Sequence, residues 1–281
     1  MSNPLKKYYR IPGIQITLPS KGIYNKDIES SLNDEIEIFP FTTEDELYLA
    51  NPDSLLNGSA LEHLVKSCAP GIKDSPRDLP MEDINAIILA AKYSTYGDEL
   101  DLGIICPNCA KEYTVSVSIR NLLRGIKYFP EETTLETGDG LKINLMPLTL
   151  ENSTKLQLAE LQNMSMVQAL LNKDIPEDEK SKLLTPSIAS MVHNAVDVII
   201  FGIWSIEVDD NGNKILVEDK KQIREFIENA PSSLTNEIKK KQEEFLHYGV
   251  NKDIHNKCPG CKNEWISKLD VDPTSFFGQN S

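Results

Sequence analysis

The sequence is poor in the residues on which many enzymes depend. Its 281 residues hold only four histidines and five cysteines, and no HExxH, GxSxG or glycine-rich phosphate-binding motif. Basic residues are also in the minority, because 29 Lys and Arg stand against 43 Asp and Glu, which gives a net charge of −14. A chain this acidic opposes partners that are bound through their phosphates. We therefore expect no enzyme activity, and no nucleic acid or anionic membrane as a partner.

Long apolar segments are missing as well. The most apolar stretch, residues 196–206, is shorter than the roughly 20 residues that a membrane-spanning helix needs, so we expect it to be a buried helix. The first ten residues are basic but lead into Pro12 and Gly13 rather than into an apolar segment, which predicts that no signal peptide is present. The sequence thus predicts a protein that folds in the cytosol.

The spacing of apolar residues predicts an α+β fold of mixed short strands and helices. Prolines and glycines between residues 8 and 25 favour an extended arm. Thr43, three residues before Glu46, is a candidate capping box at the start of a helix. Helices are expected at 43–50, 59–68, 81–96, 150–172, 186–203, 219–229 and 231–248, and strands at 35–39, 99–105, 112–119 and 142–146, with a hairpin near 204–218.

Prolines and glycines between residues 124 and 150 mark the best candidate for a domain boundary. We expect an N-terminal α+β domain at 1–125 that carries the first cysteine pair. A mainly helical inserted domain should follow at 126–249. The segment 250–281 carries the second cysteine pair and should pack on the N-terminal domain.

Four of the five cysteines form two Cys-Pro-x-Cys pairs, Cys106 with Cys109 and Cys258 with Cys261. Each tight turn can direct two sulfurs at one point about 2.3 Å from a zinc ion, and two turns complete a tetrahedral shell. A reducing cytosol favours metal over disulfides. The long separation of the pairs is tolerable because the entropy of loop closure grows only logarithmically with length. The sequence therefore predicts a split zinc ribbon with one structural zinc ion.

Other interpretations of these cysteines remain open. The pairs could be reduced turns without metal, or two separate sites, with His255 as a further ligand of the second. A redox role is disfavoured because strands rather than a helix follow each pair. Cys68 lies in a helical apolar pattern, so we expect it to be buried rather than reactive.

Several motifs of the first half follow one another in a distinctive order. They are LPSKGIYN (18–25), EIEIFPFTTEDELYLANPD (35–53), LLNGSALEHLVKSCA (55–69), DINAIILAAKYSTYG (83–97) and CPNC followed by EYTVSVSIRNL. In this order they resemble the baseplate hub protein family of T-even-type bacteriophages. The second cysteine pair and the tail WISKLDVDPTSFF are similar to the carboxyl end of the longer members, whereas the helical middle has no matching signature.

The resemblance implies a non-enzymatic structural component of a contractile-tail baseplate hub. Such a protein acts through contacts with other hub and tail proteins in a symmetric hetero-oligomer. It is part of the virion tail and is assembled in the host cytoplasm. Phe276 and Phe277, and Leu18 and Pro19 in the arm, are candidate partner contacts, because aromatic residues are favoured at interfaces and an extended arm can add a strand to a neighbouring sheet.

Two other functions compete with this interpretation. An assembly chaperone that is absent from the mature virion would have the same sequence features as a permanent component. A zinc-ribbon regulator of transcription, or another protein associated with nucleic acid, should carry basic residues around its two knuckles, the turns that hold the cysteine pairs. The surroundings of the first pair are acidic on balance, with Asp98, Glu99 and Asp101 before it.

Overall fold

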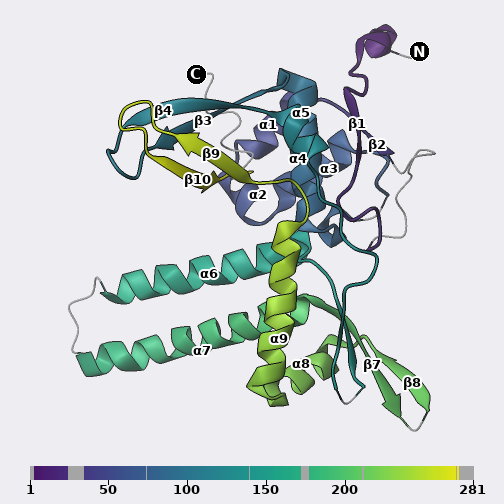
Figure 1. The fold of residues 1–281 in the computed structure, drawn as a ribbon, viewed down its shortest axis with the longest axis vertical. Coiled ribbons are helices and arrows are strands. Elements are labelled where there is room, and N and C mark those ends of the chain that lie inside the picture. The colour runs from purple at the N-terminus through teal and green to yellow at the C-terminus, as the bar shows by residue number, and fades with distance from the viewer. Residues whose placement is uncertain are drawn as a thin grey trace. The chain divides into compact units, whose positions relative to one another are not determined.

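The chain folds into two compact units, each described here by itself (Figure 1). The computed structural model describes residues 3–24, 35–73, 75–138, 140–171, 177–210, 212–269 and 271. Unit 1 comprises Met1–Leu55, Ser59–Phe129 and His247–Ser281, and unit 2 comprises Leu56–Gly58 and Pro130–Leu246. Unit 1 is thus built from both ends of the chain, and most of unit 2 is inserted between them.

Unit 1 contains three pairs of antiparallel strands and a group of helices. Strand β1 (Ile14–Thr17) pairs with β2 (Glu35–Ile38), β3 (Glu99–Ile105) with β4 (Glu112–Ser118), and β9 (Asp253–Lys257) with β10 (Glu264–Lys268). The helices are η1 (Pro4–Tyr8), α1 (Thr43–Leu49), α2 (Pro52–Leu56), α3 (Ser59–Cys68), η2 (Pro76–Asp78), α4 (Met81–Tyr96) and α5 (Ile119–Arg124).

Helix α4 forms the core of unit 1. Every residue from Asp83 to Lys92 is buried, so the helix is covered on all sides rather than along one stripe. Strands β1 and β2 and helix α3 pack against it. The helix ends at Gly97, whose φ of +91° favours glycine. The helices expected at 59–68 and 81–96 are confirmed with these bounds.

The helix expected from Thr43 begins there, but its capping residues and the expected end of one strand each differ by one residue. The capping box of α1 uses Thr42 and Asp45 instead of Thr43 and Glu46, and the Thr42 side chain accepts the backbone N–H of Asp45 at 3.2 Å. Strand β4 stops before Ile119 because the Ser118 side chain caps α5. Residues 112–119 therefore contain a strand followed at once by a helix.

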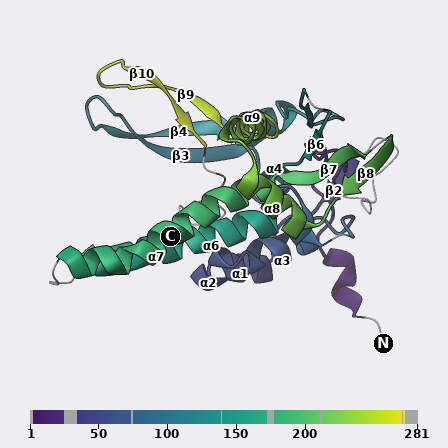
Figure 2. The ribbon, with the colours of Figure 1, turned by 90° about the horizontal axis from the view of Figure 1, so that it is seen from below.

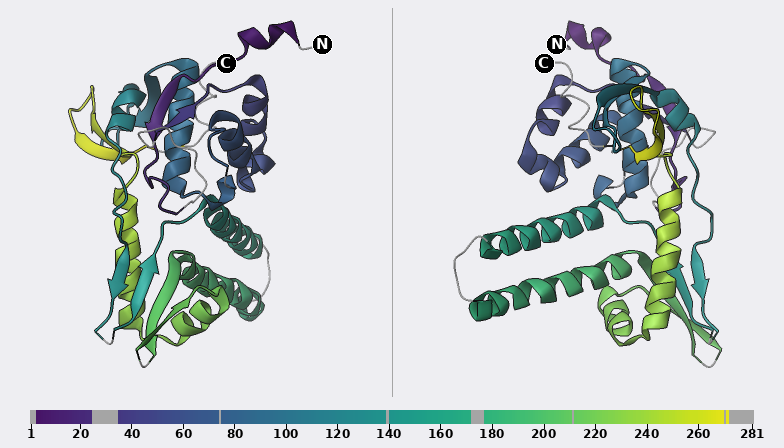
Figure 3. Two further views of the ribbon diagram at one scale, coloured as in Figure 1. Left: turned by 90° about the vertical axis from the view of Figure 1, so that its right-hand side faces the viewer. Right: turned by 60° about the vertical axis from the view of Figure 1, so that its left-hand side comes forward.

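Unit 2 combines long helices with a four-stranded antiparallel sheet. Helices α6 (Leu150–Leu171) and α7 (Glu177–Phe201) run side by side in opposite directions (Figures 1 and 3). The sheet has the order β5 (Thr134–Glu136), β6 (Lys142–Leu145), β7 (Ile203–Asp210) and β8 (Asn213–Val217). Helices α8 (Lys220–Asn229) and α9 (Ser232–Glu243) follow, and η3 (Glu244–His247) leads back to unit 1 (Figure 2).

The sequence predicted parts of unit 2 correctly. The hairpin near 204–218 is confirmed, and Gly212, with φ +87°, donates its backbone N–H to Asp209 Oδ1 at 2.7 Å in the turn. The expected helix at 186–203 begins earlier, at Glu177, and continues through Pro186. Strand β5 was not expected. Within the described part of the chain, no helix is both long and apolar enough to cross a membrane.

Candidate metal centre

Two hairpins of unit 1 carry the cysteine pairs at their tips. Strands β3 and β4 flank the first pair, and β9 and β10 flank the second. In the first turn, Ala110 N–H donates to the carbonyl of Cys106 at 2.9 Å, and in the second, Lys262 N–H donates to the carbonyl of Cys258 at 3.1 Å. Ala110 and Lys262 also share a positive φ, +55° and +65°. Both cysteine pairs therefore form the same turn, which is closed by the residue four positions after the first cysteine.

The four cysteine sulfurs converge on one point. Cys106 Sγ lies 3.7 Å from Cys261 Sγ, and Cys109 Sγ lies 3.7 Å from Cys258 Sγ. All four sulfurs lie within 4.8 Å of one another. A disulfide would hold two sulfurs about 2 Å apart, whereas a tetrahedral zinc site with bonds of about 2.3 Å separates them by about 3.8 Å. The spacing therefore fits a shared metal ion, and the four residues could hold one.

Hydrogen bonds from the protein stabilise the thiolate form of the second pair. The Asn108 side chain, from the first knuckle, donates to Cys261 Sγ at 3.5 Å and lowers the pKa of Cys261 to about 6. The backbone N–H groups of Cys261 and Gly260 donate to Cys258 Sγ at 3.5 and 3.4 Å and lower the pKa of Cys258. Because the thiolate is the form that binds metal, these donors prepare the site for an ion.

The charge of the cluster favours a cation. The backbone N–H of Lys111 lowers the pKa of Cys109, but the neighbouring sulfurs, first that of Cys261, and burial outweigh it and raise this pKa to about 12. Four thiolates cannot stand this close without a compensating positive charge. A tetrahedral set of four soft sulfurs suits zinc, and also iron.

Direct packing joins the two hairpins beside the cluster. The rings of Tyr113 on β4 and Trp265 on β10 meet edge to face, with centroids 6.3 Å apart and an angle of 88°. A Cβ atom on Gly260 would lie only 3.1 Å from Cδ of Lys111 on the other hairpin. The knuckles therefore approach each other closely, and glycine at position 260 permits this approach.

The other candidate ligands lie outside the cluster. His255 is an exposed residue of β9 and is not among the four metal-ligand side chains that the described residues bring together. Cys68 is fully buried, and burial raises its pKa to about 12. Its expected burial is therefore confirmed.

The comparison with protein families agrees with the resemblance seen in the sequence. The family described as T4 bacteriophage base plate protein matches residues 12–278, nearly the whole chain and both knuckles. The chain belongs to this T4 baseplate family. Membership implies a location in the virion tail and association with other phage tail or baseplate proteins. No curated protein and no solved structure matches the chain.

The candidate partner contacts of this baseplate protein lie in different surroundings. Leu18 is 2% exposed and Pro19 is also buried within unit 1. Strand β1, in the segment expected to join a neighbouring sheet, pairs along one edge with β2 of its own chain. Phe276 and Phe277 lie outside the described residues.

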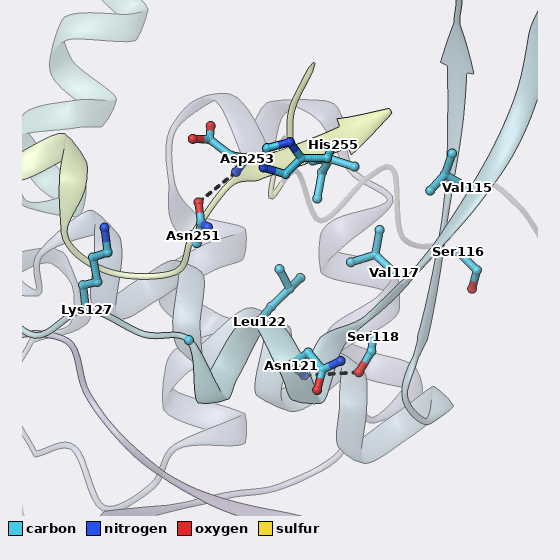
Figure 4. Close-up of a pocket in the computed structure, with 12 residues that line it drawn as sticks. Val115, Ser116, Val117, Ser118, Asn121, Leu122, Lys127, Asn251, Asp253 and His255 are labelled. Carbon is cyan, nitrogen blue, oxygen red and sulfur yellow. Dashed lines mark hydrogen bonds between the residues drawn. The ribbon is translucent and has the colours of Figure 1, made fainter. Parts of the chain in front are cut away.

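An open groove of about 450 Å³ lies between the two hairpins of the baseplate protein, lined by residues of β4, α5 and β9. Figure 4 shows Val115 and Val117 from β4 and Leu122 from α5 on one side, and Asp253 and His255 from β9 on the other. Its walls thus come from both hairpins, and their polar and apolar side chains do not form a metal-binding group within the described chain. Sequence reasoning missed this groove because β4 and β9 are far apart in the sequence.

Proposed function

We propose that this protein is a structural component of the hub of a contractile-tail phage baseplate. The observation that carries the proposal is the family match over residues 12–278, which includes the inserted unit as well as both ends of unit 1. The protein acts through contacts with other subunits in a symmetric hetero-oligomer, not through catalysis. It is assembled in the host cytoplasm and remains in the tail.

One structural zinc ion is part of this proposal. Four cysteine ligands complete a tetrahedral shell, which leaves no position for water or substrate, so the ion would stabilise the fold and not catalyse a reaction. It would tie together two hairpins whose cysteines are 149 and 155 positions apart in the sequence. The metal centre would thereby connect the two ends of the chain that make up unit 1.

The charge of the chain supports protein partners over other classes. A net charge of −14 opposes binding to nucleic acid and to anionic membranes. Zinc ribbons that bind nucleic acid carry basic residues on their hairpins. Here the strands β3 and β4 carry Glu99, Asp101 and Glu112. The second hairpin carries Lys257 and Lys268, each paired with a carboxylate of the same hairpin.

The proposal is tested by the protein content of purified virions. Quantitative mass spectrometry should find the chain in the mature tail in a fixed ratio to other baseplate proteins. A phage that lacks the chain should make no complete baseplates, and expression of the chain in the host should restore them. Baseplates that need the chain but do not contain it would make it an assembly chaperone. Complete hubs without the chain would contradict the proposed position.

A further inference from the structure

An exposed aromatic and basic arm precedes β1. This arm is Asn3–Ile11, with η1 as its first part; unlike the extended segment expected at residues 8–25, it ends before β1. Four of its large apolar side chains are mostly exposed: Leu5 60%, Tyr8 74%, Tyr9 59% and Ile11 75%. Its formal charge is +3, from Lys6, Lys7 and Arg10, so the rest of the −14 chain carries −17. Four large exposed apolar side chains within nine residues are more than isolated surface apolar residues, and grouped apolar exposure favours an interaction site.

Arg10 fixes the base of the arm to unit 1. Its guanidinium donates to the Pro40 carbonyl at 2.5 Å and to the Ser67 carbonyl at 2.7 Å, and it pairs with buried Asp45 at 3.4 Å. The cation at Arg10 is therefore used within the chain. Figures 1 and 2 show η1 standing clear of helices α1 and α2. Arg10 therefore anchors the base of the arm, while Leu5, Tyr9 and Ile11 stay mostly exposed.

Helix α1 presents a surface of the opposite charge. Glu44, Leu47 and Tyr48 are exposed at i, i+3 and i+4 on one face of α1, while Asp45 and Leu49 on the other face are buried. Leu47 is 69% exposed and Tyr48 is 40% exposed. Exposed Asp53 follows in α2, and no Lys or Arg occurs between residues 42 and 65. We call this the α1 face, defined by Glu44, Leu47, Tyr48 and Asp53.

The arm and the α1 face complement each other in both charge and apolarity. We propose that the arm of one copy binds the α1 face of a second copy. Leu5, Tyr9 and Ile11 would cover Leu47 and Tyr48, and the positive charge of the arm would face the negative charge of the α1 face. Two −14 chains repel each other, so they can associate only where charges are opposite or absent. The arm supplies that opposite charge.

The two surfaces are different parts of one chain, so the contact is head to tail. A head-to-tail contact leaves one free arm and one free α1 face in every open chain of subunits, and it closes only as a ring. This self-association goes beyond the proposed hub function, because it holds whether the protein stays in the virion or only assists assembly. It also gives a role to Asn3–Ile11, which take no part in the pairing of β1 with β2.

The test is a charge exchange, measured by sedimentation velocity on the full-length protein purified with zinc. Wild type should associate in the micromolar range, and more weakly at high salt because screening reduces exposed charge pairs. Lys6→Glu/Lys7→Glu and, separately, Glu44→Lys/Asp53→Lys should each weaken association by about tenfold or more through like-charge repulsion. An equal mixture of the two variants should associate again, because each arm then meets an α1 face of opposite charge.

Two further variants distinguish a specific contact of the arm from a general effect of net charge on association. Lys239→Glu/Lys240→Glu changes the net charge by the same amount on exposed residues of α9 and should leave association unchanged. Tyr9→Ser/Ile11→Ser keeps every charge and should weaken association, since the apolar contact is lost. A monomeric wild type, or a mixture that stays monomeric while both variants are folded and hold zinc, would overturn the proposal.

Discussion

Replacing Cys258 by serine should remove the metal and destabilise unit 1. Cys258 is fully buried, its sulfur lies 3.7 Å from Cys109 Sγ, and it accepts two backbone N–H groups. A serine hydroxyl at this position is a poor ligand for a site built for soft sulfur donors. We therefore expect metal content to fall from one ion per chain to well below that value.

The size of the effect follows from linkage between metal binding and folding. An ion that binds only the folded chain, at a free concentration about a thousandfold above its Kd, stabilises that state by about 4 kcal/mol. In a unit of this size each kcal/mol shifts Tm by roughly 2–4 °C. Loss of the site should therefore lower the Tm of unit 1 by about 8–16 °C. The two hairpins keep the contact between Tyr113 and Trp265, so some structure should survive.

Elemental analysis and scanning calorimetry on the same samples would measure both effects. Cys68→Ala is the matched control, because Cys68 is equally buried but lies outside the cluster. It should keep one ion per chain. Wild type that contains no metal, or Cys258→Ser that keeps its metal and its Tm, would refute the reasoning. Iron in place of zinc would retain the shared site and correct only the identity of the ion.

Three further predictions each concern one side chain. Asn108→Ala removes the amide that donates to Cys261 Sγ, so zinc affinity should fall about 10–100-fold in competition with a chromophoric chelator; unchanged affinity would show that this donor is dispensable. Trp265→Ala removes the ring that packs on Tyr113 and should lower the free energy of unfolding by about 2 kcal/mol in urea titrations. Asp83→Asn tests a buried carboxyl whose pKa burial raises from 3.8 to about 7. The folded chain holds this proton to a higher pH than the unfolded chain. The stability that protonated Asp83 contributes is therefore fully present below about pH 4 and is lost as the pH rises to about 7. Asparagine can keep both bonds to Ser20, so the variant should gain Tm over wild type at pH 8 but not at pH 4, and an equal difference at both values would contradict the raised pKa.

Local patterns predicted the helices well, but not the capping residues of α1 or the start of α7. Helices α3 and α4 begin and end where their apolar periodicity and Gly97 indicate. For α1, both Thr42 with Asp45 and Thr43 with Glu46 fit the pattern of a capping box. The structure uses Asp45 because its buried carboxylate also accepts the Ser67 hydroxyl at 3.0 Å and pairs with Arg10. Those partners are distant in sequence, so no local pattern could choose between the two.

Strand pairing in unit 2 shows the same limit. The hairpin of β7 and β8 is local, and the dipeptide Asn211-Gly212 in the sequence predicted it. Strand β6 extends it by pairing with β7, and at that pair the Asn144 side chain donates to Ser205 Oγ at 3.0 Å across 61 positions of sequence. Strand β5 then joins the exposed edge of β6. A three-residue strand has too little pattern of its own to be recognised before its partner is known.

The sequence by itself determined which residues could bind a metal, because a Cys-Pro-x-Cys turn places its two sulfurs through backbone geometry within a few residues. Only the tertiary structure decided that the two turns meet, because Cys109 and Cys258 come close only when both ends of the chain fold into unit 1. It also decided which apolar residues of the first 25 are available to a partner. Leu18 is buried while Ile11 is exposed, although both are branched aliphatic residues, because burial depends on which other segments of the chain cover a side chain.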